Sequence, residues 1–66
     1  MQIVVNDQTR HVADGSTVAD LLRELGLADK PVAVEVNFEL VPRQHHAGRV
    51  LAADDRLEIV TLVGGG

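Results

Sequence analysis

The residues most suited to chemistry are the last three of the chain, Gly64, Gly65 and Gly66. Glycine has no Cβ and accepts backbone angles that other residues avoid, so such a segment fits a channel that a side chain would block. A backbone carboxylate is inert until a leaving group such as AMP is attached, after which it accepts sulfur or an amine. We interpret the Gly66 carboxyl as a candidate attachment site; the alternative is that the glycines are only a frayed end.

Other residue types offer little chemistry. The chain has no cysteine, which excludes disulfides, thiolate nucleophiles and cysteine-based metal sites. Adjacent histidines point in different directions, so His45 and His46, even with His11, are not expected to bind a metal and are interpreted as exposed loop residues. Asp54 and Asp55 could suggest a cation site or paired carboxylates, but a turn before a strand explains them better. Arg43 could contact a partner, but we interpret it as an exposed loop residue. Nucleotide-binding glycine motifs are missing, and no cofactor is expected.

Size and composition narrow the class of protein. The 66 residues predict a single domain over 1–66, near the lower size limit for folding without staples. A hydrophobic share of 45% with one Phe and no Trp predicts an aliphatic core. The net charge of −4 argues against nucleic-acid binding and favours either plain solubility or a match to a basic partner. No apolar run reaches the ~20 residues of a membrane helix, and the start does not resemble a signal peptide, so a cytoplasmic protein without membrane contact is expected.

The elements that must position the glycines can be read from hydrophobic periodicity. Alternation predicts strands over residues 1–6, 9–13 and 32–36, with a turn at 6–8. A helix is expected after Ser16 or Thr17 and before Gly26, with Leu27 set to contact Leu22 in a Schellman stop. Its buried stripe should be Val18, Leu21, Leu22 and Leu25. A short strand at 40–41, a polar loop or helical turn at 43–49, and a strand at 56–62 complete the chain.

This order of elements predicts an α+β fold with a sheet of four to five strands and one helix on one face. The first and last strands should lie side by side at the sheet centre. Val60 and Leu62 would then lie on the face away from the helix, beside Val4, as a candidate docking patch. The alternative is that scattered exposed aliphatic residues need no explanation.

Taken together, these residues resemble the ubiquitin-like β-grasp sulfur carriers, and among them the ThiS family of thiamin (thiazole) biosynthesis. The resemblance covers the whole chain and is carried by the terminal glycines and by the segments MQIVVND (1–7), DGSTV (14–18), VEVNFELVPR (34–43) and DDRLEIV (54–60). It implies a mixed β-grasp sheet in the order ββαββ, with a flexible glycine tail over 63–66. Gly64 is one glycine more than the family's usual pair and only lengthens this tail.

The resemblance also implies a function. A ThiF-type adenylating enzyme would use ATP to activate the Gly66 carboxylate, a persulfide protein would supply the sulfur, and a ThiG-type thiazole synthase would receive it. Gly65 and Gly66 carry over as the functional tail, while Val60 and Leu62 fall where ubiquitin-like proteins present their contact surface. The chain would be a monomer when free and a protein co-substrate rather than an enzyme.

Three other functions remain open from the sequence. One is the small subunit of molybdopterin synthase, which also uses a terminal thiocarboxylate. Another is a ubiquitin-like modifier that forms isopeptide bonds with lysines. The last is a β-grasp binding module without tail chemistry. Removal of Gly66 separates the last from the others, and the choice of partner separates the rest.

Overall fold

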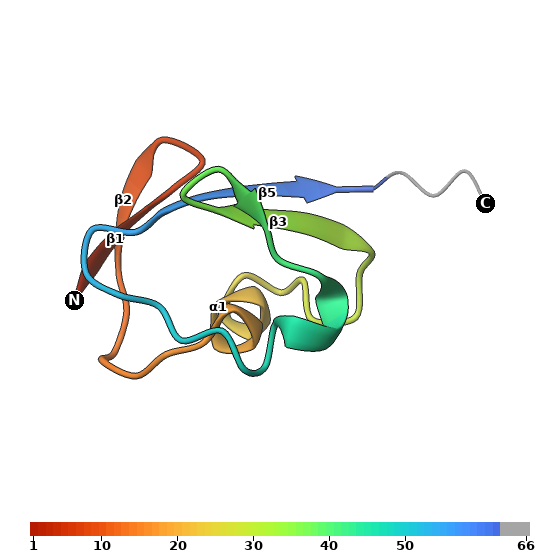
Figure 1. Cartoon of the computed structure of the whole chain (residues 1–66), viewed down its shortest axis with the longest axis horizontal. Coiled ribbons are helices and arrows are strands. Elements are labelled where there is room, and N and C mark those ends of the chain that lie inside the picture. Colours follow the sequence, from red (N-terminus) through yellow and green to blue (C-terminus); the bar gives the residue numbers. More distant parts are fainter. Residues whose placement is uncertain (63–66) are drawn as a thin grey trace.

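The computed structural model describes residues 1–62, so the predicted tail at 63–66, including its flexibility, lies outside the described residues. Figure 1 shows a sheet with one helix beneath it. The elements in chain order are β1 (Gln2–Val5), β2 (Gln8–His11), α1 (Val18–Glu24), β3 (Val32–Val36), β4 (Glu39–Leu40), the 3₁₀ turn η1 (Arg43–His45) and β5 (Arg56–Thr61). The sheet order is β2-β1-β5-β3-β4.

The sheet is mixed. Only β1 and β5 run parallel, and every other neighbouring pair is antiparallel. The prediction that the first and last strands lie side by side is therefore confirmed, with β5 in the middle of the five strands. A parallel pair needs a long crossover, and here everything between β1 and β5 supplies it, including α1.

Both hairpins close through two residues with positive φ. Such a pair is the signature of a type I′ turn, whose twist matches that of the flanking strands. The turn residues are Asn6 (49°) and Asp7 (66°) between β1 and β2, and Asn37 (51°) and Phe38 (69°) between β3 and β4. Three of these four residues are Asn or Asp, which tolerate the left-handed region well, whereas phenylalanine does not.

Helix α1 begins and ends as the sequence predicts. Thr17 is the N-cap: its Oγ1 accepts a hydrogen bond from the Asp20 backbone N (3.1 Å), and Asp20 Oδ2 accepts one from Thr17 N (3.0 Å), which forms a capping box. At the other end Gly26 has a φ of +75°, and Leu27 N donates to Leu22 O at 2.8 Å. This confirms the Schellman stop. No helix in the described part of the chain is long and apolar enough to cross a membrane.

The core lies between α1 and the inner face of the sheet and is wholly aliphatic. Strands alternate between buried and outward residues, so each contributes every second side chain. The buried hydrophobic residues are Ile3, Val5, Val12, Val18, Leu21, Leu22, Val34, Val36, Val41, Leu51, Leu57 and Ile59. The helix stripe is confirmed, although Leu25 is only half-buried at its end.

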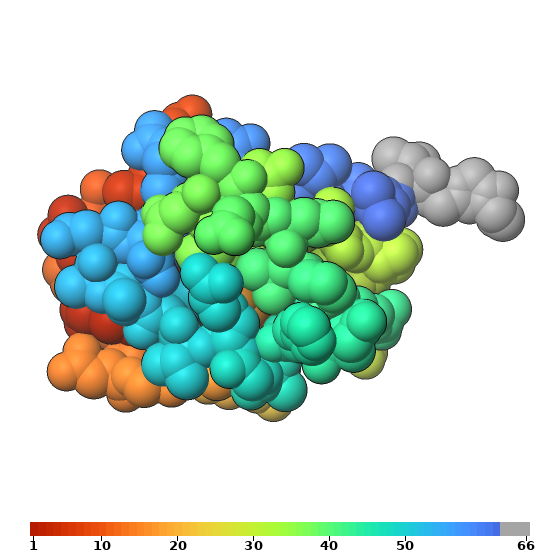
Figure 2. Space-filling view, viewed as in Figure 1, coloured from red at the N-terminus to blue at the C-terminus, as the bar shows by residue number. Residues whose placement is uncertain are grey.

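The segment between β4 and β5 packs along the side of the sheet–helix sandwich. Figure 2 shows residues of this segment, in green to cyan, covering much of one side of the molecule. Val18 N and Ala19 N at the start of α1 donate to Arg49 O and His46 O, each at 3.0 Å. The segment therefore satisfies backbone donors at the start of α1 that have no partner within the helix.

Candidate functional site

Strand β5 carries the chain toward the candidate attachment residue. It lies between β1 and β3, and Leu62 N donates to Pro31 O at 2.9 Å, which continues the pairing just past the strand end. Gly64, Gly65 and Gly66 lie outside the described residues. The structure shows the strand that leads to them: β5 pairs with β1 at Arg56 and Leu57 and with β3 as far as Thr61, two residues short of the first of these glycines.

The two faces of β5 differ as predicted. Leu57 and Ile59 are buried against α1, whereas Val60 and Leu62 are 56% and 51% exposed on the open face of the sheet. Val4 shares that open face but pairs with Arg56, four residues from Val60, which is roughly 13 Å along a strand. The structure therefore brings Val60 and Leu62 close together and leaves Val4 at the far end.

Two further exposed apolar residues, missed by the sequence interpretation, lie on the β3–β4 hairpin, and register places the first of them on the open face. Leu40 is 65% exposed and pairs in register with Glu35, and Glu35 pairs with Glu58 on its other side. Phe38, at the tip of the β3–β4 turn, is 81% exposed. The signal for Leu40 was its position two residues beyond the turn, which places it on the same face as Glu35. We call Phe38, Leu40, Glu35, Glu58, Val60 and Leu62 the open-face surface.

The open-face surface carries two carboxylates without a local counter-ion. Among residues 1–62, neither Glu35 nor Glu58 has a cationic nitrogen within 4.0 Å. Arg56 lies two residues before Glu58 on the same strand face, but its Nη2 contacts Asp7 Oδ1 at 2.7 Å. The arginine is thus held toward the β1–β2 turn, and the two glutamates are left together.

The histidine prediction was wrong in part. His45 is exposed, but His46 is only 7% exposed, and its Nε2 lies 2.9 Å from Val41 O, so the ring N–H donates to that carbonyl. Its burial is structural, because the β4–β5 segment folds back on the helix. Within residues 1–62 no group of three or more His, Cys, Asp or Glu side chains is arranged to hold a metal ion.

The predicted turn at 54–55 is confirmed, and one of its residues does more than turn the chain. Asp54 has a φ of +69°. Asp55 is buried: its Oδ1 accepts a hydrogen bond from Asn37 Nδ2 (3.0 Å) and its Oδ2 one from Ala52 N (2.8 Å). Asn37 Oδ1 in turn accepts from Arg56 N at 3.0 Å. The start of β5 is therefore tied to the β3–β4 turn.

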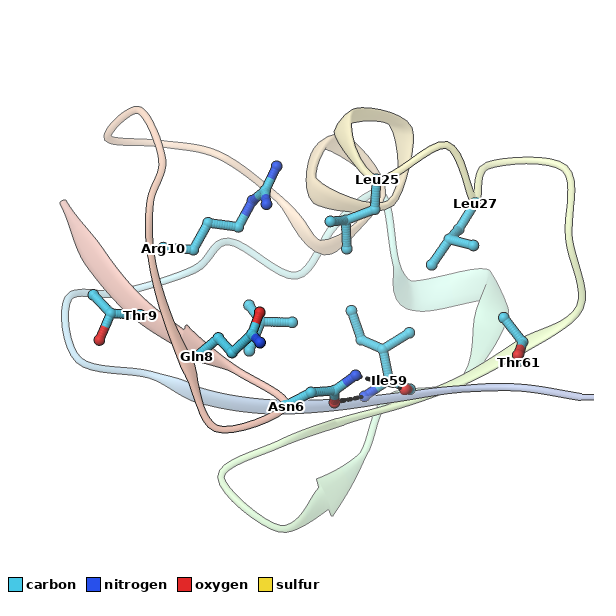
Figure 3. Close-up of a pocket in the computed structure, with 9 residues that line it drawn as sticks. Asn6, Gln8, Thr9, Arg10, Leu25, Leu27, Ile59 and Thr61 are labelled. Atoms are coloured by element: carbon cyan, nitrogen blue, oxygen red, sulfur yellow. Dashed lines mark hydrogen bonds between the residues drawn. The ribbon is translucent and has the colours of Figure 1, made fainter.

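A cavity of about 370 Å³ lies on the opposite side of β5 (Figure 3). Leu25, Leu27 and Ile59 form its apolar part, and Arg10 projects along its edge toward the helix, where Nη2 is 3.9 Å from Glu24 Oε1. Its nine lining residues include no acid, histidine or cysteine, so the cavity itself offers packing and hydrogen bonding rather than acid–base or nucleophilic chemistry.

A mixed sheet in the order β2-β1-β5-β3-β4, crossed by one helix, defines the class of ubiquitin-like β-grasp proteins. Within that class the chain belongs to the ThiS family, whose model matches residues 2–66. The sulfur carrier protein ThiS of Escherichia coli K12 is 33% identical over the full length of both chains. The crystal structure of a thiamine biosynthesis protein (ThiS) from Geobacter metallireducens superimposes with a TM-score of 0.84 at 30% identity and also covers both chains completely.

Two further relatives are much longer. They are the thiazole synthases of Paramagnetospirillum magneticum, 42% identical, and Magnetococcus marinus, 39% identical. All of this chain matches, but it spans only 20% of the length of each. Each of these two proteins, named thiazole synthase, thus contains a segment similar to the whole chain.

Proposed function

We propose that this protein is a sulfur carrier of thiamine biosynthesis that carries sulfur on the carboxyl group of Gly66. The observation that carries the proposal is the match to the E. coli sulfur carrier ThiS from end to end of both chains, with the family match running to Gly66. We further propose that residues 1–66 act as one domain whose tail, Gly64 to Gly66, enters the partners' active sites.

The proposed reaction acts on the backbone of the carrier. A Gly66 carboxylate oxygen attacks the α-phosphorus of ATP, pyrophosphate leaves, and an acyl-adenylate forms. The terminal sulfur of a persulfide then attacks the activated carbonyl and AMP leaves. A thiol cleaves the resulting S–S bond, which releases the thiocarboxylate and forms a new disulfide. Because the reacting carbon belongs to Gly66 and the partners supply the catalytic groups, the chain acts as a co-substrate rather than as an enzyme.

Three partners follow from this reaction: a ThiF-type adenylating enzyme, a persulfide sulfur donor, and a ThiG-type thiazole synthase. The relatives named thiazole synthase, each containing a segment similar to this chain, support the last of them. We propose Val60 and Leu62 as the partner surface, with Val4 at its margin, and a monomer when free. The need for ATP leads us to propose a cytoplasmic location.

The test is the intact mass of the protein after incubation with a ThiF-type enzyme, ATP and a persulfide source. We expect a gain equal to replacement of one oxygen by sulfur, absent when Gly66 is deleted. If thiazole synthase consumes the thiocarboxylate and the large subunit of molybdopterin synthase does not, the pathway is identified. A series of lysine conjugates, or no mass change with an enzyme that modifies E. coli ThiS, would overturn the proposal.

A further inference from the structure

Two glutamates lie opposite each other on the open side of the sheet. Glu35 and Glu58 are register partners on the antiparallel strands β3 and β5, and both are exposed. Directly opposite residues have Cβ atoms about 4.5–5.5 Å apart, and like charges in such positions destabilise the sheet. The pair therefore opposes folding, and the described residues offer it no cation within 4.0 Å.

The surroundings of the pair are apolar. Leu40 continues the row on the far side of Glu35. Val60 and Leu62 follow Glu58 along the same face of β5, with Ala33 opposite Val60. Three of the five large hydrophobic residues exposed in the described part lie on this face, Leu40, Val60 and Leu62, and a fourth, Phe38, lies in the turn next to Leu40's strand. A basic side chain placed between the glutamates would thus have apolar contacts on both sides.

Phe38 adds an independent observation. Its backbone is in the left-handed region, with a φ of +69°, which is unfavourable for a bulky L-residue. Its side chain is also 81% exposed. A large ring with little burial at a position that favours glycine contributes nothing evident to the fold. Strain of this kind concentrates at binding sites, so the β3–β4 turn is an expected edge of the contact.

We propose that the open-face surface docks the adenylating enzyme and that Glu35 and Glu58 together receive one arginine side chain of that enzyme. Guanidinium is the best fit because its planar fork carries five donors and bridges two carboxylates, with weaker hydration than ammonium. Docking replaces a repulsion inside the carrier with two attractions across the interface. The inference rests on the proposed function, and it names the charge that the partner must present.

The test uses the full chain and a ThiF-type adenylating enzyme from the same genome, with rates and affinity measured by biolayer interferometry. Glu35→Gln/Glu58→Gln should weaken binding by roughly three- to tenfold, through slower association and faster dissociation. The loss should shrink as salt is raised above about 0.1 M. Each single variant, Glu35→Gln or Glu58→Gln, is compared with Glu24→Gln on α1, which removes one carboxylate charge from another part of the molecule and should leave both rates unchanged.

The melting temperature separates a role of the two glutamates in binding from a role in maintaining the fold. Because the two glutamates repel each other, the same double variant should melt roughly 1–5 °C higher than the wild type. Glu58→Lys should also raise the melting temperature, since it creates an attraction to Glu35, yet weaken enzyme binding more than the double variant does. A gain in stability with a loss of affinity cannot come from a damaged fold.

The outcomes are distinguishable. If the wild type forms the adenylate while the glutamine variants bind with unchanged rates, this inference is overturned and the sulfur-carrier function stands. When no adenylate forms with an enzyme that modifies E. coli ThiS, the proposed function fails and takes the inference with it. Should sedimentation show a wild-type dimer that the variants strengthen or dissolve, the occupant is a second copy of this chain, and the inference is wrong.

Discussion

The Asn6 side chain replaces a strand residue opposite Ile59. Asn6 Oδ1 accepts a hydrogen bond from Ile59 N at 2.8 Å, and Asn6 Nδ2 donates to Ile59 O at 3.1 Å, as Figure 3 shows. The backbone of β1 leaves the sheet here, since Asn6 already belongs to the turn and has a φ of +49°. One amide thus continues the β1–β5 pairing beyond the point where the β1 backbone turns away.

This pair of hydrogen bonds predicts a graded loss of stability in two variants. Asn6→Gly keeps the backbone conformation and removes both hydrogen bonds, so it should lower the free energy of unfolding by about 1–2 kcal/mol. Asn6→Ala also brings a Cβ into the left-handed region and should cost about 1 kcal/mol more. Urea unfolding of the three proteins checks the order. Equal stability of the Gly and Ala variants would show that φ at this position relaxes in solution.

The adjacent histidines provide a matched pair. His46→Ala removes a buried ring and leaves Val41 O without its donor, so we expect a loss of about 2 kcal/mol in the free energy of unfolding. His45→Ala changes an exposed residue and should stay within about 0.5 kcal/mol of the wild type. Chemical denaturation with intact-mass verification measures both. Equal effects of the two substitutions would contradict the burial of His46.

The sequence predicts local structure here better than long-range contacts. The helix cap predicted at Ser16 or Thr17, the stop at Gly26 and the alternation along β5 depend on residues a few positions apart, and all three are confirmed, with Thr17 as the cap. The burial of His46 depends on a segment folding back onto the start of α1, which local polarity cannot indicate. A polar loop with two histidines looks exposed from sequence alone.

The candidate site likewise contains residues that the local pattern predicts and residues that only the pairing of strands reveals. Val60 and Leu62 were predicted because the period of two assigns them to one face of β5. The pairing of Glu35 with Glu58 depends on the register between strands separated by 19 residues of chain between Val36 and Arg56. Neither glutamate looks unusual in isolation, and their repulsion appears only when the strands are aligned. The period of two places Val4 on the open face, as predicted, but it lies too far along the sheet to be beside Val60.

The cap of α1 predicts a dependence on pH. The hydrogen bond from Thr17 N, followed by that from Arg23, holds the pKa of the Asp20 carboxyl below its ordinary value of 3.8. A pKa that is lower in the folded state stabilises the fold above the unfolded value and ceases to do so as the pH falls through the folded value. This contribution is therefore complete at neutral pH and disappears in strong acid.

Melting curves of Asp20→Asn and the wild type test this sign. The wild type should melt higher at neutral pH, and the gap should close as the pH is lowered below 3.8. Asp29→Asn, an exposed change outside the cap, serves as the control and should show no gap at either pH. A gap for Asp20→Asn that stays constant into acid would mean that the carboxylate charge is not what stabilises the cap.

The β3–β4 turn predicts opposite effects from two glycine substitutions. Phe38→Gly relieves a positive φ of 69° that costs an L-residue about 1–2 kcal/mol, and it increases the entropy of the unfolded chain by a smaller amount. The net expectation is a gain of roughly 0.5–1 kcal/mol in the free energy of unfolding. Asn37→Gly relieves a similar φ but loses its bonds to Asp55 and Arg56, so it should destabilise the protein by about 1–2 kcal/mol.

Urea denaturation at constant m-value measures both turn variants, and enzyme binding separates fold from function. If Phe38→Gly lowers stability, the ring packs against the protein in solution and is not solvent-exposed there. If stability rises while affinity for the adenylating enzyme falls, the ring contributes to binding and not to folding. That outcome would match the opposite-sign result expected for Glu35 and Glu58, because the ring and the glutamate pair would each weaken the isolated chain and contribute to binding in the complex.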